Sequence, residues 1–182
     1  MIRERGLDST RVADVAERAG TSAPAVLYWF ASKAELLKEA LGFAEARFYE
    51  QLDGDLAALD DPRERMVRIV AGGAAEGDYD AALWMELWAR ALRDPELAAT
   101  RAELDGRWRR AIADAVRYGQ TRGAFGPADP EEFAVLLASL LDGLAVQIAL
   151  RDTEVTPARV RELALKLAER ELGCELHEGA RC

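Results

Sequence analysis

Hydrophobic and polar positions alternate with a helical period along almost all of this 182-residue chain. Four apolar residues near the N-terminus recur at i, i+3, i+4 and i+7, the spacing of one helix face: Val12, Val15, Ala16 and Ala19. Thr10 lies where an N-cap residue is expected, and Gly20 follows as a C-terminal stop. The pattern therefore predicts a short amphipathic helix between these two residues.

Two more helices are predicted directly after it. Ser22 can cap a second short helix that runs to about Phe30. Ser32, with Glu35 three residues later, forms a capping box for a third helix. The apolar pattern of this third helix continues to about Leu52.

The rest of the chain reads as longer helices separated by short breaks. They are expected over residues 62–75, 78–94, 95–122, 131–151 and 157–172. The helix over 78–94 is apolar on most sides, with Glu86, Arg90 and Arg93 as its one wet face, so we expect it to be buried. No strand pattern and no internal repeat is evident, and the predicted fold class is all-α.

Composition and charge narrow the function. The net charge is −9, but residues 1–41 hold six basic and six acidic residues, so the deficit belongs to the remainder. A neutral N-terminal part on an acidic body is compatible with DNA binding at one end only. The start is too polar for a secretory signal, and no apolar run is long enough to span a membrane.

Reactive and metal-binding side chains are few. Both cysteines, Cys174 and Cys182, lie in the polar C-terminal tail and form neither a disulfide framework nor a metal motif, so a reduced cytoplasm is expected. The single histidine, His177, lies in the same tail, and no catalytic constellation is evident. We therefore predict a protein that is not an enzyme and has no metal or cofactor.

Two short helices joined by a tight turn containing glycine form a helix-turn-helix, whose second helix enters the major groove of DNA. In that second helix the core positions are Val26 and Phe30, flanked by Ala23 and Leu27. Three residues are then expected on the outward face: Ala25, Tyr28 and Trp29. An outward Tyr–Trp pair needs a partner, and DNA phosphates, sugars and thymine methyls can supply one. Alternatively, the two rings pack on the third helix.

The stretch STRVADVAERAGTSAPAVLYWFASKAELLKEAL resembles the DNA-binding region of the tetracycline-repressor (TetR) family. The shared pattern is [VI]-A-x-x-A-G-x-S, then an aromatic pair ending in Phe, then S-K-x-x-L-L. Further on, LWMELWARALRDPEL, RWRRAI and LLDGLAVQIAL resemble the ligand-binding domain of the branch that includes choline- and betaine-responsive repressors. The resemblance extends from about Gly6 to Gly173.

This resemblance implies a homodimeric repressor that binds a palindromic double-stranded DNA operator and is released by a small molecule. It implies a DNA-binding domain over residues 1–45, a ligand-binding and dimerisation domain over 46–173 that dimerises through the last two long helices, and a flexible tail over 174–182. The family's usual DNA-contact positions are occupied here by Thr10, Ser22, Ala25, Tyr28, Trp29 and Lys33.

Three features depart from the family pattern. Ala23 replaces a frequent lysine, and Leu27 replaces a frequent phosphate-binding tyrosine, a role that Tyr28 can assume. Only MIRERG precedes the motif, where the family has a complete helix. Either the given sequence starts late, or the chain is a dimeric small-molecule-binding protein that has lost DNA binding.

Aromatic and isolated polar residues in the larger part suggest an effector site. The candidates are Trp84, Trp88, Trp108, Asp142 and Gln147. Trp rings and acidic groups suit a cation, such as a polyamine or a quaternary amine. Each has a structural alternative: the tryptophans can be plain core, and Asp142 can cap a helix or pair across a dimer seam.

Overall fold

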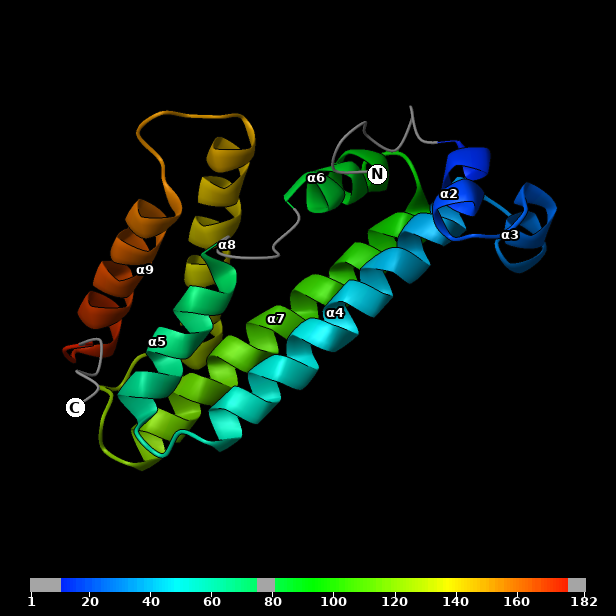
Figure 1. Ribbon diagram of the computed structural model, residues 1–182. Coiled ribbons are helices and arrows are strands. Elements are labelled where there is room, and N and C mark those ends of the chain that lie inside the picture. Colours follow the sequence, from blue (N-terminus) through cyan, green and yellow to red (C-terminus); the bar gives the residue numbers. More distant parts are fainter. Residues whose placement is uncertain (1–10, 75–80, 177–182) are drawn as a thin grey trace. The chain divides into compact units, whose positions relative to one another are not determined.

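The computed structural model describes residues 11–74 and 81–176. Their regular elements are helices (Figure 1): α2 (Val12–Arg18), α3 (Ala23–Trp29), α4 (Lys33–Ala57), α5 (Pro62–Gly73), α6 (Ala81–Ala91), α7 (Pro95–Thr121), α8 (Pro130–Ala149) and α9 (Pro157–Leu172). No strand occurs in these two ranges, which confirms the predicted all-α class.

The chain divides into two compact units. The first comprises residues 1–48 and 80–103, and the second comprises 49–79 and 104–182. Helices α4 and α7 contribute to both units because each runs across a boundary. The predicted domain boundary at residue 45 lies close to the boundary between residues 48 and 49. The first unit, however, also includes α6 and the start of α7.

The helix-turn-helix lies in the first unit, where α2 packs against α3. The N-cap of α2 is Arg11, whose backbone N–H donates to Asp14 Oδ2 at 3.0 Å. The helix thus starts one residue later than Thr10 predicts, and Thr10 itself lies outside the described residues. Gly20, with φ of 66°, supplies the left-handed turn that separates the two helices.

Local capping sets the start of the next helices as predicted. Ser22 Oγ accepts a hydrogen bond from Ala25 N–H at 3.3 Å and caps α3. Ser32 Oγ accepts from Glu35 N–H at 3.1 Å at the start of α4. The Glu35 carboxylate, however, accepts from the backbone N–H of Ala31 at 2.6 Å, one residue before the position that the capping box predicts.

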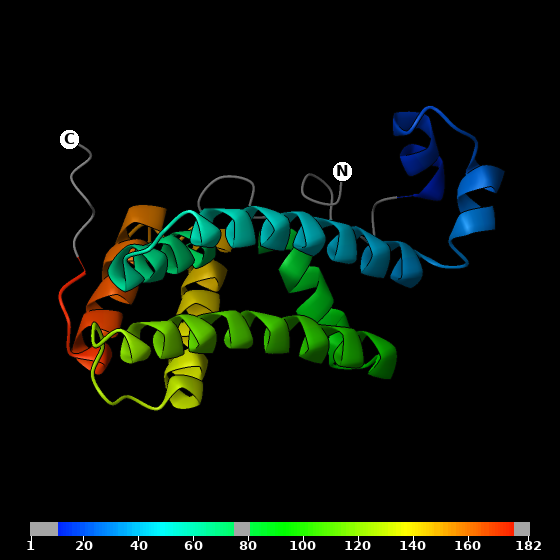
Figure 2. The ribbon, with the colours of Figure 1, turned by 90° about the horizontal axis from the view of Figure 1, so that it is seen from below.

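Within each unit, the segments of α4 and α7 that belong to it run in the same direction (Figure 2). In the first unit Lys38 Nζ pairs with Glu96 Oε1 at 3.1 Å. In the second, the Arg107 guanidinium lies 3.8 Å from the Tyr49 ring centroid, a cation–π contact. The partners in both pairs are 58 residues apart in sequence. Within each unit, therefore, a residue of α4 pairs with the residue of α7 that lies 58 positions later.

Three helices of the second unit, α5, α8 and α9, pack against one another. The inner face of α8 supplies fully buried side chains, among them Leu137 and Leu141. Gly73 ends α5 where α8 approaches closely: a Cβ at this position would lie 2.6 Å from Leu141 Cδ1 and 3.0 Å from Trp108 Cζ2. The missing side chain thus lets α5, α7 and α8 meet.

The chain after α9 is partly held in place. Gly173 ends the helix with φ of 61°. Leu176 is buried, and its backbone N–H donates to Glu169 Oε1 at 2.9 Å. Residues 174–176 of the predicted flexible tail thus include one buried apolar side chain and one hydrogen bond to α9. Residues 177–182 lie outside the described part.

Candidate functional site

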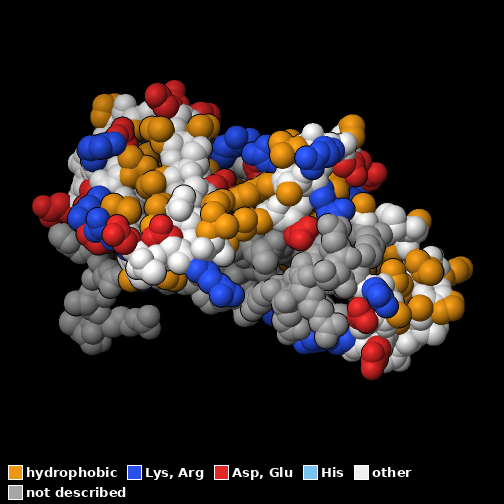
Figure 3. All heavy atoms as spheres, turned by 90° about the horizontal axis from the view of Figure 1, so that it is seen from above, with side chains coloured by type: hydrophobic (Ala, Val, Ile, Leu, Met, Phe, Trp, Pro, Cys, Tyr) orange, Lys and Arg blue, Asp and Glu red, His pale blue; other side chains and the backbone are white. Residues whose placement is uncertain are grey.

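Helix α3 presents three consecutive large side chains to solvent: Leu27, Tyr28 and Trp29 are 52%, 81% and 73% exposed. Figure 3 shows hydrophobic side chains gathered over this helix, at the right of the view. The Tyr28 and Trp29 rings meet edge to face, with centroids 5.4 Å apart. The outward orientation of these two rings is confirmed, and packing on α4 is excluded.

The prediction that Leu27 flanks the core positions of α3 is wrong, because its side chain is exposed. Val26 is the buried residue of α3, and Leu27 lies about 100° around the helix from it. Such a position is covered only if a neighbouring helix reaches it. More than half of the Leu27 side chain is open to solvent instead.

The other predicted DNA-contact residues surround this face. Ser22 is exposed, and its oxygen accepts the capping bond while its proton remains available to donate. Ala25 is half-buried. Lys33 is the first residue of α4, but its side chain lies outside the described part, as does the whole of Thr10.

Two of the predicted effector residues, Trp84 and Trp88, lie half-buried on α6 in the first unit. The Trp88 indole N–H is buried without a hydrogen-bond partner among the described residues. On the polar face of α6, Arg90 Nε lies 3.5 Å from Glu86 Oε2, an ion pair between residues four apart on the helix. The helix is only partly buried, because Leu87 alone among its described side chains is fully covered.

The remaining predicted effector residues belong to the second unit. Trp108 is half-buried, with its ring close to Gly73. Asp142 is half-buried on α8, and Gln147 is exposed on the same helix. The five candidates are thus divided between the two units, and their joint role in one site stays a prediction.

A groove of about 750 Å³ lies in the second unit between the start of α5 and the end of α9. Its lining includes Asp61, Arg63, Glu64, Glu169, Cys174 and Glu175. Burial raises the pKa of the Cys174 thiol. The groove has no signal in the sequence, because its two segments are distant in the chain and carry no local pattern. Its charged lining differs from the mostly apolar lining of small-molecule pockets.

Helix α8 keeps a second apolar surface on the side away from the core. Val135 and Leu136 are exposed, and Ser139 and Gly143 continue the same face. A Cβ at Gly143 would touch nothing within 4 Å in this chain. By length and mean hydropathy α8 would suit a membrane span, but six of its residues lie in the helical core. The outer apolar face is therefore a candidate protein contact.

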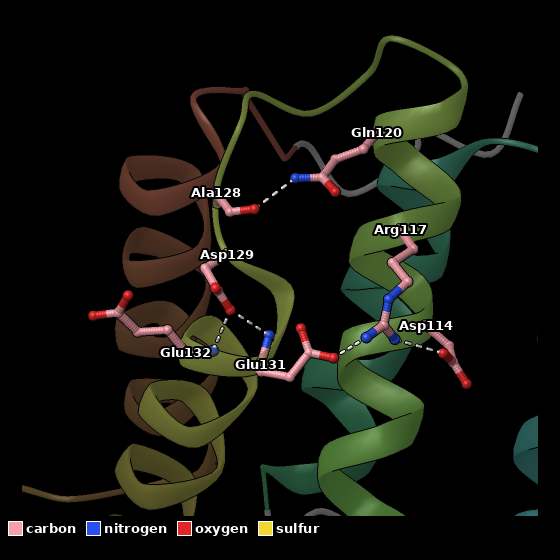
Figure 4. A network of polar contacts seen from close by, with 7 residues as sticks. All are labelled: Asp114, Arg117, Gln120, Ala128, Asp129, Glu131 and Glu132. Carbon is pink, nitrogen blue, oxygen red and sulfur yellow. Dashed lines mark hydrogen bonds and ion pairs between the residues drawn. The ribbon is translucent and has the colours of Figure 1, made fainter.

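Polar contacts hold the start of α8 to α7 (Figure 4). Arg117 pairs with Asp114 at 2.9 Å and also with Glu131. Gln120 Nε2 donates to the backbone oxygen of Ala128 at 2.7 Å. Asp129 Oδ1 caps α8 by accepting from the next N–H groups at 2.9 Å. Of these contacts, Arg117–Glu131 and Gln120–Ala128 join α7 to the start of α8.

Comparison with known proteins agrees with this arrangement. Residues 1–40 match the family of bacterial regulatory proteins called the tetR family. Residues 61–173 match the family described as BetI-type transcriptional repressor, C-terminal. The chain is 28% identical to the HTH-type transcriptional regulator BetI of Serratia proteamaculans (strain 568) over 167 residues, which cover 87% of this chain and 80% of that one.

Solved structures share the fold. One, from Saccharomonospora viridis, is described as a transcriptional regulator in complex with choline; it is 28% identical, with a TM-score of 0.86, over 94% of this chain and 91% of that one. A TetR transcription regulator from Haloarcula marismortui, 23% identical, shares the fold with a TM-score of 0.84 over 94% and 92% of the two chains. The chain therefore belongs to the tetR family of bacterial regulatory proteins, which are DNA-binding transcriptional regulators and not enzymes, and its C-terminal part is of the BetI-type repressor family.

Proposed function

We propose that this regulator acts in the bacterial cytoplasm as a homodimer that holds a palindromic operator through α3 and releases it when a small organic cation binds. The observation that carries the proposal is the exposed pair Tyr28 and Trp29 on the second helix of the helix-turn-helix. Two adjacent aromatic rings open to water indicate a surface that is covered in the functional state.

DNA fits this surface chemically. The Tyr28 hydroxyl and the Trp29 indole N–H can donate to phosphate oxygens, while the rings lie against sugars. Ser22, which caps α3, offers a hydroxyl for the same purpose. Thr10, one residue before the N-cap Arg11 in the sequence, is a further hydroxyl to test. Lys33, which begins α4, adds a positive charge. These contacts position the protein on the duplex.

Dimerisation through the last two helices is supported by the outer face of α8. Val135, Leu136 and Gly143 form an apolar strip that a second copy can cover. The outer face of α9 is charged instead, with Glu162 paired to Arg159 and Lys166, so α8 supplies most of the apolar contact. A twofold dimer suits a palindrome when its two α3 helices lie about 34–36 Å apart.

A cationic effector is supported by the choline-bound relative and by the tryptophans of α6 and α7. Indole rings attract quaternary ammonium groups through cation–π interactions. The ligand needs only to bind the DNA-incompetent form more tightly than the competent form. We include Trp84, Trp88, Trp108, Asp142 and Gln147 as the residues to test one at a time.

The DNA contact is tested by selecting bound duplexes from random DNA with the full-length protein. Trp29→Ala should then weaken operator binding by about thirtyfold, since a buried aromatic contact is worth about 2 kcal/mol. The matched control is Leu92→Ala, which truncates another exposed apolar residue of the first unit, outside α3. Equal operator affinities for the two variants would show that α3 is not part of the DNA interface.

The effector is tested by calorimetry with choline and with 3,3-dimethyl-1-butanol, its neutral isostere. Choline should bind and lower operator affinity, whereas the neutral alcohol should do neither. Binding of both compounds alike would exclude recognition of the charge. If the selection yields no DNA sequence but choline binds the dimer, the chain is a small-molecule-binding protein without operator recognition.

A further inference from the structure

The recognition helix α3 contains no charged side chain and no side-chain amide. Its seven residues are APAVLYW, and the residue that caps it is Ser22. The side chains it exposes most are those of Leu27, Tyr28 and Trp29. Pro24 is exposed as well, and with Leu27 and Tyr28 it forms one face at i, i+3 and i+4.

This composition removes the usual means of reading bases. Guanine is recognised by two hydrogen bonds from Arg or Lys, adenine by two from Asn or Gln, and cytosine by Asp or Glu as acceptors. None of these six residue types occurs in α3. The base-edge feature that an apolar side chain recognises in the major groove is the C5-methyl group of thymine.

We infer that α3 reads its operator through thymine methyl groups and that Leu27 is the specificity-determining residue. The inference rests on the proposed role of α3 in DNA binding. Leu27 is more than half exposed, so an apolar side chain stands at a position that is open to solvent. Its methyl groups can surround a thymine methyl, with the Pro24 ring beside them. Each half-site therefore contains thymine opposite this face.

Tyr28 and Trp29 add to the contact with DNA but contribute little to the discrimination between bases. Each ring has a single polar group, and one hydrogen bond discriminates bases less than a bidentate pair. Their edge-to-face arrangement also keeps the two rings together as one block next to Leu27. They anchor α3 to the backbone, and this anchoring sets the depth at which Leu27 meets the bases.

The test uses the selected operator resynthesised with uracil in place of thymine, one position at a time. Uracil differs only by the lost methyl group, so affinity should fall about fourfold at each contacted position, equivalent to about 0.8 kcal/mol. The dependence of affinity on salt should not change, because the phosphate contacts are intact. Fluorescence anisotropy at fixed salt measures both quantities.

Leu27→Ala completes a double-mutant cycle. In this variant the penalty for uracil should vanish at the position that Leu27 contacts and should persist in the control variant Leu92→Ala. The side chain is exposed, so the fold should be unaffected, and a thermal unfolding curve verifies this. Full affinity of the wild type for every uracil-substituted duplex would overturn the methyl readout while leaving DNA binding intact. Failure to bind even the unsubstituted duplex would overturn the proposed function itself, and this inference with it.

Discussion

Helices α3 and α8 both expose large apolar side chains, but they bury different numbers of residues in the core. Helix α3 has seven residues and buries one of them, Val26. Helix α8 has 20 residues and buries six. We therefore propose different roles for the exposed apolar side chains of the two helices. On α3 they are proposed to face DNA with little core beneath, and on α8 they form the second face of a helix that buries six residues in the core.

Because α3 buries one residue and α8 buries six, we expect substitutions in the two helices to affect different properties. Changes on α3 should alter DNA recognition and leave unfolding almost unchanged. Changes on the inner face of α8 should alter unfolding, and changes on its outer face should alter assembly. The following variants test whether the two helices divide these roles.

The largest effect is expected for Leu137→Ala in the core of α8. The side chain is fully buried, so its truncation removes apolar contacts and leaves a cavity, at a cost of about 2–5 kcal/mol. Leu27→Ala on α3 should change the unfolding free energy by less than about 0.5 kcal/mol. Urea unfolding of both variants decides the point, and equal losses would mean that α3 is part of the core.

A charge on the outer face of α8 should act on assembly instead. Leu136→Glu places a carboxylate in the proposed dimer contact, which should weaken dimerisation by about a hundredfold, equivalent to roughly 3 kcal/mol. Leu92→Glu, exposed in the first unit, is the control. Sedimentation equilibrium measures the dissociation constant, and an unchanged dimer in both variants would place the contact elsewhere.

A smaller effect on stability is expected where α5 meets α8. Gly73→Ala would bring a methyl group against Leu141 and the Trp108 ring, so both must shift, at a cost of about 1–3 kcal/mol. Gly143→Ala, on the open face of α8, should leave the monomer unaffected. Thermal unfolding of the two variants at low protein concentration compares them. A Gly73→Ala protein as stable as wild type would show that α5 and α8 are loosely packed.

The smallest effect is expected from the charged face of α9. Hydrogen bonds from Lys166 and Arg159 hold the pKa of Glu162 at about 2, below its ordinary value of 4.5. Because the pKa is lowered in the folded state, the stabilisation is present above about pH 4.5 and is lost as the pH falls toward 2. Wild type and Glu162→Gln should therefore differ slightly in Tm at pH 7 and converge in acid. A constant difference down to pH 2 would contradict this.

Much of the fold follows from local rules. Ser22 and Ser32 cap helices as predicted, because the capping bond joins residues close together in the chain. The starts of α5 and α7 at Pro62 and Pro95 likewise agree with the sequence, since proline favours the first helical turn.

Other features depend on contacts between distant segments. Leu27 lies at the edge of the apolar side of α3, and only the position of neighbouring helices decides whether it is covered. Leu176 reads as part of a polar tail, yet a bond to Glu169 and its own burial hold it in place. The approach of α8 to Gly73 has no signal in the sequence, because it joins residues far apart in the chain. Such features require the tertiary structure.

The absence of charge on α3 has a consequence for how the regulator responds to changes in ionic strength. Counterion release makes total affinity for DNA fall as salt rises, and the charges responsible lie outside this helix. Methyl contacts release no counterions. The ratio between operator and competitor affinities should therefore stay constant while both affinities decline, so that the protein leaves DNA in concentrated salt without losing its preference among sites.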